Sequence, residues 1–165
     1  MTADPARQAA IAGLVLAACA FAAACAGAGP SAGSDAEQRI QTVISETHSG
    51  LAEARREVVR DAASWTRLWS EIHAGRDPVP ALPAVDFERE MLIAVASGTR
   101  PTGGFSIQVT AVATRGDRLE VAVLERCPEA DAIVTMALTQ PVAVVRVAKL
   151  AQTPTFQDAR TGACR

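Results

Sequence analysis

The chain has 165 residues, a formal net charge of −2 and four cysteines, and 49% of its residues are hydrophobic. Binding to nucleic-acid phosphates needs a basic surface, so this charge balance predicts no nucleic-acid partner. Without its N-terminal leader the chain keeps about 140 residues, the size of one ordinary domain.

Residues 1–24 have the layout of a secretory signal, with a polar start that carries Arg7, an Ala-rich apolar run and small residues at the end. Cys19 follows Leu-Ala-Ala, which resembles the bacterial lipoprotein box, and Cys25 follows the weaker match Ala-Ala-Ala. We therefore predict lipidation at Cys19, with Cys25 as the alternative. A plain secretory signal and an uncleaved membrane anchor are the other interpretations of this leader.

The leader also predicts where the protein resides. Acyl chains such as palmitate on the mature cysteine would hold it at a membrane surface of the bacterial cell envelope, facing the periplasm or the cell exterior. The Gly-, Ala- and Ser-rich residues 25–37 read as a flexible tether. Residues 38–165 then form a single globular domain.

Two cysteines remain in this domain, Cys127 and Cys164. An even pair in an exported protein predicts a disulfide. A metal site is the alternative, but neither cysteine has a second Cys or a His at ligand spacing. We expect no metal and no cofactor.

The clearest helix covers residues 61–75. Asp61 is a good N-cap, and Gly75 is a stop signal. Four apolar residues recur at i, i+3, i+4 and i+7, which indicates a core-facing stripe: Trp65, Leu68, Trp69 and Ile72. Two tryptophans could instead form an exposed binding platform, but their shared face favours the core. His73, beside the stripe, is expected to be half exposed.

Strands are predicted on both sides of this helix. The continuous apolar run at 90–96 suits a strand that is buried on both faces. Residues 105–114 and 118–126 alternate around Arg115-Gly116-Asp117, which indicates a hairpin. Further strands are expected at 57–59, 133–138, 142–147 and 155–156, and a Pro-rich crossover at 77–85. Residues 40–46 alternate loosely and fit a strand, with a helix as the alternative. The fold class is therefore α+β and β-rich, with one amphipathic helix on a curved, mostly antiparallel sheet of about five to seven strands.

The most informative segment lies between the strands at 90–96 and 105–114. It combines a proline with two glycines, which permit a tight turn and the close approach of a partner. Loops shaped in this way on a rigid sheet often bind partners. The predicted partner-binding residues are Arg100, Pro101, Thr102, Gly103, Gly104 and Phe105. The alternative is a structural corner in which the glycines serve only the geometry.

Motifs for catalysis are absent from the sequence: there is no Gly-x-Ser-x-Gly elbow and no His-Glu-x-x-His helix. Asp86, Glu88 and Glu90 are spaced so that a strand would place them on one face, where they could act in acid–base chemistry or bind Ca²⁺. A solvated strand entrance explains the same spacing. Arg115-Gly116-Asp117 also spells the integrin tripeptide, but we interpret it as a turn. We expect no enzyme activity.

A longer pattern is carried by Trp65-x-x-Leu68-Trp69, Pro80, Val85-Asp86-Phe87, the apolar run 91–95 and Gly98-x-Arg100-Pro101-Thr102-Gly103-Gly104-Phe105. This pattern resembles the C-terminal domain family of the protease complex subunit PrcB. The later Ala137-Leu138-Thr139-Gln140-Pro141 and Cys164 fit it too. This chain has Phe105 where the family commonly has Tyr.

The resemblance implies a non-enzymatic exported lipoprotein that binds another exported protein, as an accessory or chaperone subunit of a secreted protease. A second likeness implies an alternative. Pro101 to Phe105 are similar to the Pro-Thr-Thr-Gly-Tyr loop of chagasin-type protease inhibitors. On that basis, the 100–105 loop would insert into a protease cleft.

Overall fold

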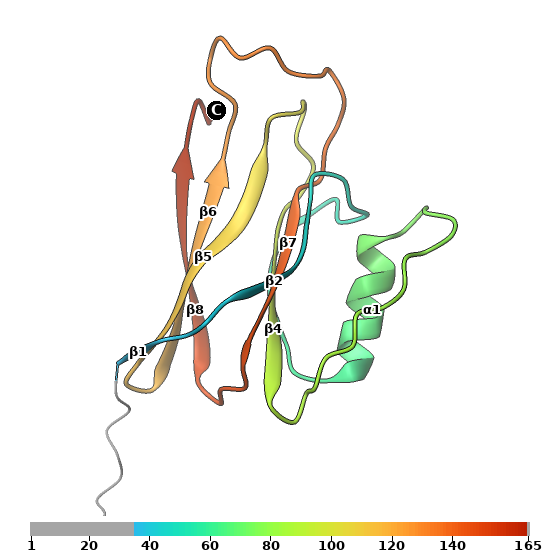
Figure 1. The fold of residues 1–165 in the computed structure, drawn as a ribbon. Helices are drawn as coiled ribbons and strands as arrows, with labels where there is room; N and C mark the ends of the chain where they lie inside the picture. Colours follow the sequence, from blue (N-terminus) through green and yellow to red (C-terminus); the bar gives the residue numbers. More distant parts are fainter. Residues whose placement is uncertain (1–34, 165) are drawn as a thin grey trace, which may run out of the picture. The chain divides into compact units, whose positions relative to one another are not determined.

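The computed structural model describes residues 35–164, which form eight strands and one helix (Figure 1). The predicted leader, both candidate lipidation cysteines and nearly all of the tether lie outside these residues. The first strand, β1 (Ala36–Glu37), takes up two residues that were assigned to the tether.

The strands form two four-stranded sheets. The first sheet has the order β2-β7-β4-β3, built from β2 (Gln41–Glu46), β7 (Val142–Ala148), β4 (Glu90–Ser97) and β3 (Ala54–Val59). The second has the order β1-β5-β6-β8, with β5 (Ser106–Arg115), β6 (Arg118–Arg126) and β8 (Thr153–Thr161). Neighbouring strands are antiparallel, except that β6 and β8 run parallel.

The prediction of one curved sheet is therefore wrong, although the β-rich class with a single helix is confirmed. The reason lies in β4, which is buried on both faces as its apolar run predicted. Leu92, Ala94 and Ala96 pack with the helix, whereas Met91, Ile93 and Val95 pack with the second sheet. The run indicates that both faces are covered, but not that a second sheet covers one of them.

The helix α1 (Ala62–Ile72) lies on the outer face of the first sheet (Figure 1). Asp61 caps it by accepting a hydrogen bond of 2.8 Å from the Ser64 amide, as predicted. Trp65, Leu68, Trp69 and Ile72 are all buried, which confirms the core-facing stripe. The Pro-rich crossover is fastened to them, because the indole N–H groups of Trp65 and Trp69 donate to the carbonyls of Pro83 and Pro80.

Three other expectations are corrected. His73 is 1% exposed, not half exposed, because its ring stacks on Trp69 and its Nδ1 bonds to the Trp69 carbonyl. Residues 133–138 form no strand, since β2 and β4 already occupy both edges of β7. The strand expected at 155–156 is the nine-residue β8, whose mostly exposed, polar side chains leave little hydrophobic pattern.

Candidate functional site

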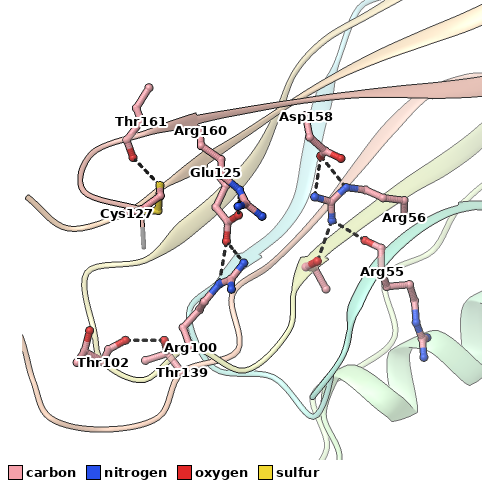
Figure 2. A network of polar contacts seen from close by, with 12 residues as sticks. Arg55, Arg56, Arg100, Thr102, Glu125, Cys127, Thr139, Asp158, Arg160 and Thr161 are labelled. Carbon is pink, nitrogen blue, oxygen red and sulfur yellow. Dashed lines mark hydrogen bonds and ion pairs between the residues drawn. A yellow bond between two sulfur atoms is a disulfide. The ribbon is translucent and has the colours of Figure 1, made fainter.

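The 100–105 segment, here called the glycine loop, joins β4 to β5 at one end of the two sheets. It lies against the segment that precedes β7. Arg100 and Thr139 exchange two backbone hydrogen bonds of 2.7 and 3.0 Å, and the Gly103 amide donates to the Thr135 carbonyl at 2.9 Å. The Thr139 hydroxyl also donates to the Thr102 carbonyl (Figure 2). The loop is thus held along its length by residues 135–139.

The two glycines permit this close approach of another part of the same chain, which is what the alternative interpretation of a structural corner requires. A Cβ on Gly103 would lie 2.3 Å from the Thr135 hydroxyl oxygen. Gly104 has a φ of +84°, and a Cβ there would meet Pro128 and Val134 at 3.0 Å. Backbone in this region is strained for residues that carry a side chain. Gly104 is therefore the more restricted of the two positions.

Arg100, one of the predicted partner-binding residues, has a partner inside the domain. Only 26% of its side chain is exposed, and its guanidinium donates to the carboxylate of Glu125 in β6. Glu125 is 5% exposed, and Arg160 in β8 approaches its second oxygen at 3.1 Å (Figure 2). Arg100 also lies 5.7 Å from the centre of the Phe105 ring, within cation–π range. These contacts fix the base of the glycine loop to the second sheet.

Sequence reasoning missed Glu125, although a signal was present. Leu119, Val121 and Val123 alternate along β6 and are fully buried, and Glu125 continues the same inward phase. A carboxylate at such a position needs a buried cationic partner, because an unpaired buried charge is very costly. The sequence thus indicated a hidden ion pair, but not which arginine would complete it.

Three large apolar side chains stand out in solvent beside the glycine loop. Ile133 is fully exposed, Met136 is 87% exposed and Leu138 is 63% exposed. They belong to residues 132–138, here called the apolar loop, in which every residue is uncharged. Two more exposed large apolar side chains in the described part of the chain, Val79 and Leu82, lie in the Pro-rich crossover instead. An apolar cluster of this kind marks a binding surface more often than scattered single residues do.

The predicted disulfide is confirmed. Cys127, directly after β6, bonds to Cys164 near the end of the described chain, with 5.2 Å between their Cα atoms. Further backbone bonds hold the same place, from the Cys127 amide to Thr161 and from the Ala163 amide to Pro128. The disulfide therefore fastens the start of the segment that leads into the apolar loop.

Other candidates from the sequence are not brought together. Asp86 and Glu88 lie in the turn before β4, and only Glu90 is in the strand, so the three carboxylates share no strand face. Within residues 35–164 there is no group of three His, Cys, Asp or Glu side chains that could hold a metal ion. Arg115 pairs with Arg118 across Gly116, so Arg115-Gly116-Asp117 forms the hairpin turn that we predicted. No helix of the described chain has the length and apolarity to cross a bilayer.

Comparison with known proteins finds one family. A family model described as PrcB C-terminal matches residues 91–148, from β4 to the end of β7. This match includes the glycine loop and the apolar loop, and it confirms the family prediction made from the sequence. No curated protein and no solved structure gives a significant match.

Proposed function

We propose that this protein is a non-enzymatic accessory subunit that binds another exported protein, a secreted protease, through the apolar loop and the glycine loop beneath it. The observation that carries the proposal is the exposure of Ile133, Met136 and Leu138 on a segment without charges. The family match supports the class of partner, because it associates the chain with subunits of a protease complex.

The site has the properties of a preformed binding surface. Burial of apolar side chains against a partner contributes about 25 cal/mol for each Å² removed from water. Ordering a loop on binding opposes this gain. The hydrogen bonds to the glycine loop, together with the disulfide at Cys127, hold the apolar loop before any partner arrives. Less ordering is then left for the binding step.

The position of the site agrees with a membrane-tethered protein. Ala36 in β1 pairs with Thr114 near the hairpin turn, whereas the glycine loop precedes Ser106 at the other end of β5. The chain therefore enters the domain at the end opposite the apolar loop. If the leader is lipidated as proposed, the tether joins the end that lies away from the binding surface. This arrangement supports a location in the bacterial cell envelope, with the site facing a partner there.

The alternative is an inhibitor that inserts the glycine loop into a protease cleft. That role needs a loop that projects far enough to enter a cleft, but Arg100, Thr102, Gly103 and Phe105 are all only partly exposed. The apolar loop, which is exposed along nearly all its length, is the more accessible of the two. The geometry therefore favours the accessory role.

A charge placed on the apolar loop tests the proposal. Exported proteases of the same cell are co-expressed one at a time with the tagged full chain, and capture and protease yield are measured. Met136→Glu should abolish capture with little change in the melting temperature, because Met136 is exposed. Val79→Glu, an equally drastic change at an exposed apolar residue of the crossover, is the matched control and should leave capture intact.

The same experiment separates the two roles. An accessory subunit raises the yield or stability of the captured protease, whereas an inhibitor lowers its turnover at equimolar dose. Capture that survives Met136→Glu and Ile133→Glu alike would show that the partner surface lies elsewhere.

A further inference from the structure

A hollow of about 500 Å³ lies at the end of the first sheet that is farther from the apolar loop. Three arginines from separate parts of the chain line it: Arg39 just before β2, Arg89 just before β4, and Arg146 in β7. The carboxylate of Glu90 lines it too. We call this hollow the arginine pocket. It is separate from the proposed protein-binding surface, because β4 and β7 run their whole lengths between the two.

The pocket carries more positive than negative charge. The Arg146 guanidinium lies 3.4 Å from the Glu90 carboxylate and donates to the Ala84 carbonyl. The charges of Arg146 and Glu90 therefore offset each other. Arg89 has only a loose contact of 3.9 Å with Asp86, and its side chain is almost fully exposed. Arg39 has no hydrogen bond or ion pair with any other residue in 35–164. Two guanidinium groups are therefore available to a ligand.

This surplus contributes nothing evident to the fold. Like charges gathered around one concavity repel each other, and a hollow whose lining carries an excess of one sign of charge concentrates the field that attracts a counter-ion. The neighbouring Lys149 is already occupied by the Phe87 carbonyl at 2.6 Å. A bound anion would relieve the repulsion between Arg39, Arg89 and Arg146.

We propose that the arginine pocket binds the phosphate group of an anionic ligand. Guanidinium groups bind phosphate oxygens with paired N–H donors, which makes arginine the side chain best suited to this group. A phosphate offers enough oxygens to accept from Arg39 and Arg89 together and still face Arg146, whereas a carboxylate has only two oxygens. The volume exceeds what a bare phosphate fills, so the remainder of a phosphorylated small molecule or a lipid head group has room.

The phosphate could belong to a lipid head group or to a soluble phosphorylated compound. Arg39 lies four residues after Asp35, so the pocket is at the end of the domain where the chain enters. A lipid-anchored protein would carry this end toward the bilayer, and anionic phospholipid head groups would then be within reach. A soluble phosphorylated compound needs no such placement.

The experiment uses the folded chain without its leader and measures binding of two probes. Inorganic phosphate and glycerol phosphate are titrated while backbone amide NMR shifts near Arg39, Glu90 and Arg146 are followed. Vesicles of phosphatidylcholine, with and without phosphatidylglycerol, are tested by co-sedimentation. Saturable shifts with the soluble probes identify a soluble ligand, and sedimentation only with phosphatidylglycerol identifies the lipid head group.

The variant Arg39→Gln/Arg89→Gln should weaken either form of binding at least about tenfold. The melting temperature should not change, because the loose, exposed contact of Arg89 with Asp86 contributes little to stability. Arg118→Gln is the matched control: this exposed arginine lies at the same end of the molecule, in the hairpin and outside the pocket lining. Its binding should equal that of the unmodified chain. Binding of neither probe, or equal loss in Arg118→Gln, would overturn the proposal.

Discussion

Glu125 shows how one residue can decide the role of another. Its carboxylate is buried in β6 and lies between Arg100 from the glycine loop and Arg160 from β8. The main role of Arg100 is therefore structural, since its guanidinium compensates the buried negative charge of Glu125. The loop sequence alone does not reveal this, because the partner lies 25 residues further along the chain.

Arg100→Ala is therefore expected to destabilise the domain. Loss of one member of a buried pair costs about 3–5 kcal/mol, and we expect roughly 2–3 kcal/mol because Arg160 remains near Glu125 and Arg100 is partly exposed. Chemical denaturation checks the value. Arg126→Ala, an exposed neighbour of Glu125 with no ion pair in the described chain, should shift stability by no more than about 0.5 kcal/mol.

A second variant identifies the cause. Glu125→Gln combined with Arg100→Met removes both charges and should be more stable than Arg100→Ala alone, because no unpaired carboxylate remains. If Arg100→Ala melts like the unmodified chain, the ion pair does not form in solution, and Arg100 would be available for a partner after all.

At the scale of the element, the helix is held to the domain by more than its apolar stripe. Trp69 is buried, and its indole N–H donates to the Pro80 carbonyl at 2.9 Å. Trp69→Ala should cost about 3–5 kcal/mol, the range for deletion of a large buried aromatic side chain. Trp69→Phe keeps an aromatic ring but loses the hydrogen bond, so its stability should lie between those of the unmodified chain and Trp69→Ala. An unchanged unfolding midpoint for Trp69→Ala would place the ring outside the core.

The start of the helix should give a pH-dependent contribution. The Ser64 backbone amide and hydroxyl both donate to the Asp61 carboxylate, and these bonds hold the pKa of Asp61 below its usual value. A carboxyl group whose pKa is lower in the folded state stabilises the protein above the unfolded pKa, near 3.9. This stabilisation is lost as the pH falls through the folded pKa.

Melting curves of the unmodified chain and Asp61→Ala should therefore differ most near neutral pH and converge in acid. Asp61→Asn retains an oxygen that accepts the Ser64 amide, and it does not titrate. Its advantage over Asp61→Ala should persist at every pH. A constant difference between the unmodified chain and Asp61→Ala down to low pH would mean that the carboxylate charge contributes nothing.

The elements differ in how far they could be predicted, and the differences have physical causes. Local patterns determine α1 and the β5–β6 hairpin, because the apolar stripe, the cap and the Gly116 turn are set within a few residues. The 133–138 segment has the composition of a strand, but β7, the strand that follows it and could pair with it as a hairpin, already has β2 and β4 on its two sides. The long β8 is held by its parallel pairing with β6, a contact between distant parts of the chain. The polar sequence of this edge strand contains no pattern that predicts the pairing.

The same limit applied to the candidate site. The two glycines and the cysteine pair were recognised from residue type and spacing, and their geometry agrees. The exposed apolar loop was missed because Ile133, Met136 and Leu138 look like core residues in the sequence. Exposure depends on which edges and faces the rest of the molecule has already filled, so it becomes visible only in the assembled fold.

At the scale of the whole molecule, we expect the two ends of the two-sheet domain to have different functions. The apolar loop and the glycine loop lie at one end, and the chain enters from the leader side at the other. This division is useful only if the leader acts as an anchor. The proposed lipidation therefore gives a prediction about the whole protein that is independent of the partner.

In the native host, mass spectrometry of the mature protein should find an N-terminal acylated cysteine at Cys19 or Cys25. Cys19→Ser and Cys25→Ser, made separately, identify the modified position, because only one of them should release the protein from the membrane fraction. The released variant should keep the unmodified chain's melting temperature, since neither cysteine belongs to the described domain. An intact Met1, or a mature end that leaves neither cysteine first, would contradict the anchor. The protein-binding surface would then have to work on a freely diffusing molecule.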